Sequence, residues 1–258
     1  MKLIRSAKKM QQLAARGKRD GKRIVLVPTM GALHKGHVSL IRRARKLGDW
    51  VVVSIYVNAT QFGRREDFSK YPRTLARDLE LCREEKVDFV FAPKNLYEKD
   101  HSTWVEEKVI SQDRCGRSRP NLFRGVTTVV SKLFHLVQPD VAVFGQKDAQ
   151  QGEVVAQMVR DLNFPIKIVM ASTFREKDGL AMSSRNRYLS VKERRIAPQL
   201  FQILKQAAKL KRGRREVFAY EALRKAGLRV DYVEEVNQRL CAAVWLGKTR
   251  LIDNVSVT

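Results

Sequence analysis

The sequence predicts an α/β fold in two parts, a parallel sheet with helices on both faces and a smaller α+β domain. Two patterns support this prediction. Short branched apolar runs alternate with helical patterns over roughly the first 170 residues, and such alternation is typical of βαβ units. After residue 175 the alternation ends, and mainly helical patterns lead into short strands. We therefore expect one domain over residues 1–174 and a second over residues 175–258.

The expected sheet consists of buried strands, which show as continuous apolar runs. These runs occupy residues 24–28, 50–57, 88–93, 141–144 and 166–170. Helices are expected between them, at residues 36–47, from Pro72 through Cys82, from Val126 through Phe134, and over residues 148–162. The first residues are compatible with an amphipathic helix that passes through Leu3, Ile4, Ala7, Met10, Leu13 and Ala14.

The second part should contain helices over residues 191–227 and short strands at residues 229–236 and 249–257. No internal repeat or low-complexity tract interrupts either part of the sequence. The first part therefore has the pattern of a Rossmann-like domain, and the second that of a smaller α+β domain.

Composition narrows the class of protein. No apolar run approaches the ~18 residues that a membrane span needs, and the basic start lacks the long apolar segment of a secretory signal. Three widely spaced cysteines, Cys82, Cys115 and Cys241, predict neither a disulfide framework nor a zinc site. We expect a cytoplasmic protein that has no contact with a membrane.

The chain carries 51 Lys and Arg against 27 Asp and Glu, a formal charge of +24. Clustered cations are typical of nucleic-acid binding, but here they are spread along the chain, and only local groups such as residues 209–215 stand out. No aromatic stacking motif accompanies them. We interpret the charge as a solvated basic surface, and we do not expect nucleic acid as a partner.

Two of the four histidines, His34 and His37, lie in one turn of small residues after the strand at 24–28. Ligands of open parallel sheets bind where strands lead into helices, and a helix start near Gly36 favours an anion. Gly31, Ala32 and Gly36 would let the backbone approach that ligand closely. A single histidine could be merely structural, but the spacing H-x-G-H in this context predicts a nucleotidyltransferase-type phosphate site.

The wider segment PTMGALHKGHVSL resembles the first motif of the pantothenate synthetase (pantoate–β-alanine ligase) family. Similarity continues in order through residues 54–75, 122–151, 175–190 and 246–254. The resemblance implies that ATP adenylates the carboxylate of (R)-pantoate with release of pyrophosphate. The amine of β-alanine then attacks the adenylate to give pantothenate and AMP.

The resemblance also implies roles for individual residues. His37, His34 and Lys147 would be catalytic, with His37 as the expected proton donor. Gln61 and Gln151 would bind pantoate, Gln61 would also orient β-alanine, and Asn58 and Tyr71 would flank that pocket. Contacts with ATP are expected from Met30, Gly31, Ala32, Leu33, His34, Lys35, Gly36, His37, Gly145, Gln146, Lys147, Asp148, Phe174, Met182, Ser183, Ser184 and Arg185.

The family further implies a homodimer and a C-terminal domain that acts as a lid carrying Ser183, Ser184 and Arg185. Mg²⁺ is expected to arrive with ATP on phosphate oxygens and water. No protein residue is assigned as a metal ligand, although Asp78 is a candidate for an outer contact. The chain departs from the usual family pattern at Ala59, Asn121-Leu122, Gln146 and Phe174, and by a short segment between Tyr232 and Leu240.

Two other functions stay open at this stage. The chain could be a nucleotidyltransferase that uses H-x-G-H with another acid, although the paired Gln61 and Gln151 argue against this. It could also be a basic nucleic-acid-binding protein with a vestigial nucleotide site, although the intact segments 145–148 and 182–185 argue against decay. ATP–pyrophosphate exchange with pantoate, with other hydroxy acids and with no acid would separate these functions.

Overall fold

The computed structural model describes residues 1–63 and 66–257, and its chain divides into two compact units. The first unit contains residues 1–146 and 150–171, and the second contains residues 147–149 and the chain from residue 172 onward. Arg64 and Arg65, which belong to the motif at 54–75, lie outside the described residues. None of the helices in the described ranges combines the length and apolar character needed to cross a membrane.

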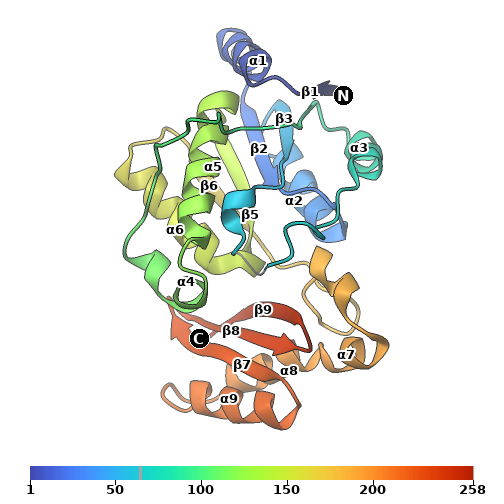
Figure 1. The fold of residues 1–258 in the computed structure, drawn as a ribbon, viewed down its shortest axis with the longest axis vertical. Coiled ribbons are helices and arrows are strands. Elements are labelled where there is room, and N and C mark those ends of the chain that lie inside the picture. Colours follow the sequence, from blue (N-terminus) through green and yellow to red (C-terminus); the bar gives the residue numbers. More distant parts are fainter. Residues whose placement is uncertain (64–65, 258) are drawn as a thin grey trace. The chain divides into compact units, whose positions relative to one another are not determined.

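A six-stranded parallel sheet forms the centre of the first unit (Figure 1). Its strands are β1 (Lys2–Ile4), β2 (Ile24–Thr29), β3 (Trp50–Ile55), β4 (Phe89–Phe91), β5 (Val141–Gly145) and β6 (Lys167–Ala171). Their order across the sheet is β1-β4-β3-β2-β5-β6. The sheet confirms the predicted α/β class, and it places the predicted strands β3, β2 and β5 next to one another.

Helices cover the sheet of the first unit because the strands bury side chains on both faces. The α-helices between and after the strands are α1 (Ala7–Arg19), α2 (Lys35–Arg45), α3 (Leu75–Glu84), α4 (Arg114–Ser118), α5 (Leu122–Val137) and α6 (Ala149–Asp161). Short 3-10 turns occur at η1 (Ala59–Gln61), η2 (Ile110–Gln112) and η3 (Gln146–Asp148), and η3 lies where the chain passes between the two units. Val25 and Val27 of β2 pack with Ile41 of α2 and Cys82 of α3 in one buried cluster. Leu26 points to the opposite face and is also fully buried.

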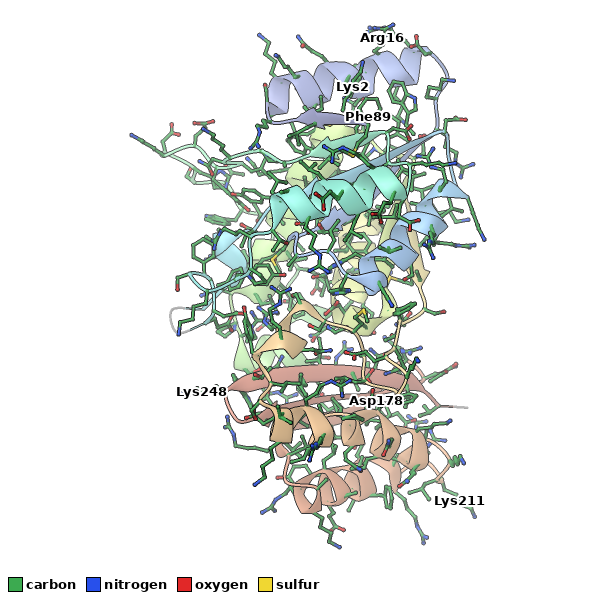
Figure 2. The ribbon with its side chains drawn as sticks, turned by 90° about the vertical axis from the view of Figure 1, so that its right-hand side faces the viewer. Lys2, Arg16, Phe89, Asp178, Lys211 and Lys248 are labelled. Atoms are coloured by element: carbon green, nitrogen blue, oxygen red, sulfur yellow. The ribbon has the colours of Figure 1, made fainter. Side chains whose placement is uncertain are left out.

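The amino terminus differs from the amphipathic helix that the sequence suggested. Lys2–Ile4 is a strand at the sheet edge, where Lys2 pairs with Phe89 (Figure 2). Helix α1 begins only at Ala7, after Ser6, whose side chain accepts a hydrogen bond from the Lys9 amide at 3.3 Å. The apolar spacing of Leu3 and Ile4 is therefore used by a strand, because β4 offers them a partner edge.

Pro72 does not lie in the first turn of a helix, so this prediction from the sequence is wrong. Helix α3 begins at Leu75, and the segment before it is held by Arg73, whose guanidinium donates to the carbonyls of Tyr71 and Phe68, both at 3.2 Å. Thr74 ends this segment and donates from its hydroxyl to Asp78 at 3.1 Å. The start of α3 is therefore fixed by side-chain contacts that local sequence does not reveal.

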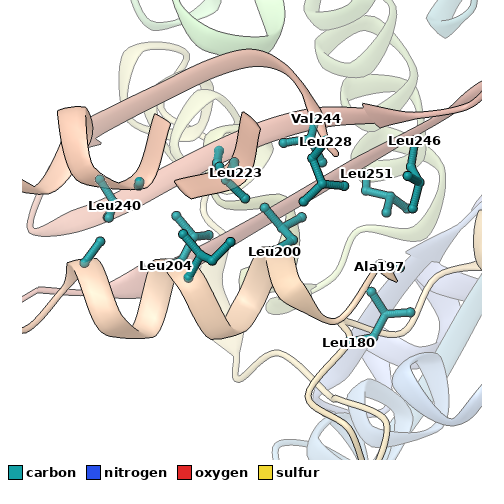
Figure 3. Close-up of a cluster of buried hydrophobic side chains, with 14 of the residues drawn as sticks. Leu180, Ala197, Leu200, Leu204, Leu223, Leu228, Leu240, Val244, Leu246 and Leu251 are labelled. Atoms are coloured by element: carbon teal, nitrogen blue, oxygen red, sulfur yellow. The ribbon is translucent and has the colours of Figure 1, made fainter. Parts of the chain in front are cut away.

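The second unit has a three-stranded antiparallel sheet with helices (Figure 1). Its elements are η4 (Ser184–Tyr188), α7 (Val191–Ile196), α8 (Gln199–Ala207), α9 (Arg215–Lys225), β7 (Arg229–Val236), β8 (Arg239–Leu246) and β9 (Thr249–Ser256). Leu200 and Leu204 of α8 meet Leu223 of α9 and Leu240 and Val244 of β8 in its core (Figure 3). This smaller α+β arrangement agrees with the prediction, except that the central strand β8 was not foreseen.

The short segment between Tyr232 and Leu240 forms a tight hairpin. Asn237 and Gln238 connect β7 to β8, and both have positive φ angles, 49° and 59°. Two consecutive left-handed residues give the turn whose twist matches that of the flanking antiparallel strands. The shortened segment is thus a two-residue connection between the long strands, and it leaves the sheet intact.

Candidate active site

Three segments of the first unit begin at the same edge of its parallel sheet, where strands end. Residues 30–34 follow β2, η1 follows β3, and α6 is the helix that comes after β5. Because β3, β2 and β5 are neighbours, the carboxyl ends of these strands bring together the histidine turn, Gln61 and Gln151. Sequence separation between these segments is large, so the sheet order is what assembles them. This edge is where open parallel sheets bind ligands.

The histidine turn passes directly into helix α2. His34 is the N-cap residue, and its Nδ1 accepts a hydrogen bond from the Gly36 amide at 3.2 Å. A nitrogen that accepts cannot carry the proton, so the neutral ring of His34 has its proton on Nε2. The ring centroid of His37, in the first turn of α2, lies 4.1 Å from that of His34, with the planes at 31°. The turn therefore presents two imidazoles together beside a helix start.

Backbone N–H groups of the same turn are engaged by the protein. The Gly31 amide donates to Thr29 Oγ1 at 3.1 Å, while the Ala32 and Leu33 amides donate to the carboxylate of Asp78 at 3.0 and 2.8 Å. These bonds use the N–H groups of Gly31, Ala32 and Leu33 within the protein, and the close approach of a ligand to the backbone at Gly31, Ala32 and Gly36 stays a prediction. The predicted ATP contacts of Met30, Gly31, Ala32 and Leu33 stay predictions.

Asp78 is buried in α3 beneath this turn, with only 1% of its surface exposed. Both of its carboxylate oxygens accept backbone N–H groups, and the outer metal contact that the sequence suggested for Asp78 stays a prediction. In residues 1–63 and 66–257 no group of three or more His, Cys, Asp or Glu side chains is arranged to hold a metal ion. Burial, and then the charge of Asp78, raise the pKa of the neighbouring Cys82 thiol to about 12, so this cysteine stays protonated at neutral pH.

Gln61 is the last residue of η1, and its side chain is half-buried. The η1 turn is fixed by Asn58, whose amide donates to the Gly125 carbonyl of α5 at 3.0 Å and whose oxygen accepts from the Thr60 hydroxyl at 3.0 Å. Arg119 donates to the Gln61 carbonyl at 3.0 Å. Asn58 is only 1% exposed, so it holds the position of Gln61 from within the protein core.

Tyr71, the other expected neighbour of the pocket, is also buried and is 5% exposed. Its ring packs edge-on against Phe62, with the centroids 5.7 Å apart. Phe62 directly follows Gln61, so Tyr71 supports the end of η1 through this aromatic contact.

Gln151 lies in the first turn of α6 and is half-buried. Its neighbour Gln150 is buried and donates to the carbonyls of Ile110 and Asp113, both at 2.8 Å. One turn further on, Glu153 receives the guanidinium of Arg114 at 2.7 Å, and Arg114 is 1% exposed. Sequence reasoning missed this network, which fixes the start of α6 and hence the position of Gln151.

Lys147 and Asp148 belong to the second unit. The Lys147 ammonium donates to Asp148 Oδ1 at 3.3 Å, and the Lys147 carbonyl accepts from the side-chain amide of Asn254 at 3.1 Å. The carbonyl oxygen of the same Asn254 side chain accepts from Arg239 at 2.7 Å, which orients the amide. Gly145 and Gln146 belong to the first unit. The resemblance assigned no role to the segment 246–254; here its Asn254 anchors Lys147.

The segment that contains Met182, Ser183, Ser184 and Arg185 is fastened within the second unit. The Met182 amide donates to the Phe174 carbonyl at 3.0 Å, and Arg175 pairs with Ala181 in an antiparallel bridge. The Ser183 hydroxyl accepts from the Arg185 amide at 3.3 Å and so begins η4. Phe174 is 39% exposed.

Arg175 and Asp253 form a buried ion pair beneath this segment. Arg175 donates to the two Asp253 oxygens at 2.5 and 2.9 Å and to the Gly179 carbonyl at 3.1 Å. Its guanidinium carbon lies 3.7 Å from the ring centroid of Phe201. Burial raises the pKa of the Asp253 carboxyl, and the bonds and charge of Arg175 oppose this rise. The pair ties the turn at 175–181 to strand β9.

Comparison with known proteins gives the family of the chain. The family model described as pantoate-beta-alanine ligase matches residues 2–256.

The chain belongs to the pantoate-beta-alanine ligase family.

Among curated relatives, a pantothenate synthetase from Thermosipho melanesiensis is 47% identical, over 100% of this chain and 99% of the relative. One from Azotobacter vinelandii is 44% identical, over 98% of each chain. The family is thus shown by matches over nearly the whole length of both proteins, and the chain is a ligase.

Solved structures of the family share the fold. The crystal structure of pantothenate synthetase from Thermus thermophilus superposes with a TM-score of 0.93 at 38% identity, covering 99% of both chains. The ligase from Francisella tularensis, complexed with beta-gamma ATP and β-alanine, gives a TM-score of 0.89 at 34% identity and covers 99% of this chain and 97% of that one. The predicted fold and family are therefore confirmed.

Proposed function

We propose that this ligase condenses (R)-pantoate with β-alanine in two ATP-dependent steps through a pantoyl adenylate. The observation that carries this proposal is the gathering of the histidine turn, Gln61 and Gln151 at the carboxyl ends of three adjacent strands. The family match over residues 2–256 supports it, as does the Francisella relative that was solved with beta-gamma ATP and β-alanine.

In the first step a pantoate carboxylate oxygen attacks the α-phosphorus of ATP. The new O–P bond forms as the bond from that phosphorus to the bridging oxygen breaks, and pyrophosphate leaves with the electron pair. His34 would donate from Nε2 to a phosphate oxygen, and His37 would donate a second hydrogen bond or its proton as charge develops. A neutral His34 adds no positive charge beside His37, so the two rings can lie 4.1 Å apart without repulsion.

In the second step the β-alanine amine attacks the acyl carbon of the adenylate. The C–N bond forms, the bond from the acyl carbon to the AMP oxygen breaks, and the amine loses a proton. Gln61 and Gln151 would hold the hydroxyl groups of pantoate, because a carboxamide both donates and accepts. Gln61 would also orient the amine of β-alanine for attack.

The roles proposed for residues of the second unit follow from the similarity of their sequence motifs to those of the ligase family. Lys147, Asp148, Phe174 and residues 182–185 would contact ATP, and Mg²⁺ would enter as MgATP on phosphate oxygens and water. The lid role of the second domain, its boundary at residue 175, the homodimer, the cytoplasmic location and the absence of a nucleic-acid partner stay predictions.

The experiment is ATP–pyrophosphate exchange, measured as incorporation of labelled pyrophosphate into ATP. Exchange that requires pantoate and proceeds without β-alanine would support the adenylate. Formation of AMP and pantothenate should then require β-alanine as well. Exchange with another hydroxy acid but not pantoate would indicate a different nucleotidyltransferase, and exchange with no acid present would contradict the proposed order of steps.

A further inference from the structure

The turn that carries His34 has an unusual backbone. Gly31 and Ala32 are consecutive residues with positive φ angles, 79° and 49°. A left-handed conformation is unfavourable for a non-glycine residue, so Ala32 needs compensation from its surroundings. At Gly31 a side chain would be strained by the positive φ and would crowd its neighbours, because a Cβ atom would lie 3.0 Å from Ile55 Cγ2 and 3.1 Å from Asp78 Oδ2.

Asp78 supplies that compensation. The left-handed pair turns two successive N–H groups, those of Ala32 and Leu33, toward the Asp78 carboxylate, and each oxygen accepts one of them. Thr74 adds a third donor at 3.1 Å from Oδ1. Hydrogen bonds to an ionised acceptor are roughly twice as strong as neutral ones, and here they are shielded from water because Asp78 is 1% exposed.

Only a carboxylate satisfies this arrangement at position 78. An asparagine side chain has the same shape but one acceptor oxygen, so its NH₂ group would face a backbone N–H or the Thr74 hydroxyl. A backbone N–H group that lost its acceptor would then be buried without a hydrogen bond, which is unfavourable. The turn would then relax to another conformation, and His34 immediately follows the turn.

We propose that Asp78 is a positioning residue, which holds residues 31–33 so that His34 caps helix α2 with Nδ1 and directs its Nε2–H toward the substrate phosphates. The geometry supports this through one continuous chain of contacts, from the Asp78 carboxylate to the Leu33 amide at 2.8 Å and from His34 Nδ1 to the Gly36 amide at 3.2 Å. The catalytic consequence rests on the proposed function, whereas the structural link does not.

The four histidines of the chain give a direct readout by ¹⁵N NMR of the imidazole nitrogens. His34 should show the Nε2–H tautomer. His135 is an internal reference of opposite type, because its Nδ1 lies 2.8 Å from the Ser131 carbonyl, which can only accept. Single-histidine substitutions would assign the signals, and the measurement requires no substrate.

The test compares Asp78→Asn with Asp140→Asn. Asp140 also accepts a backbone amide of strand β2, that of Ile24 at 2.7 Å, but at the opposite end of the strand from the histidine turn. In Asp78→Asn we expect the His34 pattern to shift toward a mixture of tautomers while His135 stays unchanged. We also expect kcat of pantoate-dependent exchange to fall about 10- to 100-fold, the loss expected when a catalytic group is misplaced. KM for pantoate should change less than about threefold, since Gln61 and Gln151 lie on other segments.

Asp140→Asn should alter neither the His34 pattern nor kcat. If Asp78→Asn does not fold, Thr74→Val removes one of the three donors and should cause a smaller shift of the same kind. A folded Asp78→Asn with the wild-type His34 pattern and kcat within twofold of wild type would overturn the proposal. If the wild-type protein shows no pantoate-dependent exchange, the proposed function fails, while the NMR comparison still decides whether Asp78 positions His34.

Discussion

Replacing Arg175 by Met should destabilise the protein by roughly 3–5 kcal/mol, because it leaves a buried carboxylate without its cation. The Asp253 side chain is 1% exposed and accepts two hydrogen bonds from Arg175, at 2.5 and 2.9 Å. Methionine is unbranched and apolar, so it retains contact with Phe201 and removes only the charge and the donors. At roughly 2–4 °C per kcal/mol for a chain of this size, Tm should fall by roughly 6–20 °C.

Calorimetry at pH 8 measures this change, and Arg16→Met is the matched control. Arg16 pairs with Asp20 across 3.6 Å, but the two side chains are 73% and 50% exposed, and Arg16 lies at the surface of α1 (Figure 2). An exposed pair of this kind contributes little, so the control should stay within about 0.5 kcal/mol of wild type. The double variant Arg175→Met, Asp253→Leu should recover most of the loss, since no buried charge is left.

The stability loss of Arg175→Met should depend on pH, and the shift in the pKa of Asp253 gives the direction of this dependence. Burial raises the pKa of Asp253, and removing Arg175 takes away the largest of the interactions that oppose the rise, while those of the Asn254 amide and the Lys147 charge remain. When the folded-state pKa lies above the unfolded-state value, the folded protein binds the proton more tightly. That contribution is fully present below the unfolded-state pKa and is lost as pH rises through the folded-state pKa. The deficit of Arg175→Met should therefore be smaller at pH 5 than at pH 8. Equal Tm values for Arg175→Met and Arg16→Met at pH 8 would refute this reasoning.

Three further predictions concern catalysis and the support of the site. His37→Ala should lower pantoate-dependent exchange by roughly two to four orders of magnitude while the fold survives; a folded variant with near-normal exchange would remove the role of His37. Gln151→Ala should raise KM for pantoate much more than KM for ATP in steady-state assays. Equal increases of the two KM values would indicate that Gln151 supports the structure of the site and does not bind pantoate. Gly125→Ala would place a Cβ atom 2.5 Å from the Thr60 carbonyl oxygen, so we expect a loss of roughly 1–3 kcal/mol with a higher KM for pantoate. Unchanged Tm and KM would show that the contact between α5 and η1 accepts the added Cβ atom, which would contradict this prediction.

Elements with a continuous apolar run were predictable from sequence because burial on both faces leaves a strong local signal. Strands β2, β3 and β5 were located to within two residues at each end. Strand β1 was not predicted, because three residues carry no periodic signal and its existence depends on the edge of β4. Strand β8 was also missed, although its apolar residues Leu240–Val244 form the centre of the second sheet.

In the candidate site, too, local sequence patterns were predictable and contacts between distant residues were not. Its motif residues could be found from sequence, because H-x-G-H and its companion segments are local patterns that resemble one family. The residues that position them could not be found, since each acts across a long separation. Asp78 lies 45 residues from Leu33, and Asn254 lies 107 residues from Lys147. A single Asp in a helix, or a single Asn in a strand, has no local feature that distinguishes it from a surface residue.

The amides of the histidine turn donate to protein side chains, and this bears on the predicted role of its two histidines. In glycine-rich phosphate loops the backbone N–H groups themselves surround the anion. Here the amides of Gly31, Ala32 and Leu33 are bound to Thr29 and Asp78, so they offer no donors to a phosphate. We expect the start of helix α2 and the side chains that follow the turn to supply the donors instead, and an imidazole can do so as a neutral ring. Gly31 and Ala32 therefore serve to shape the turn, and we expect His34 and His37 to bind the anion.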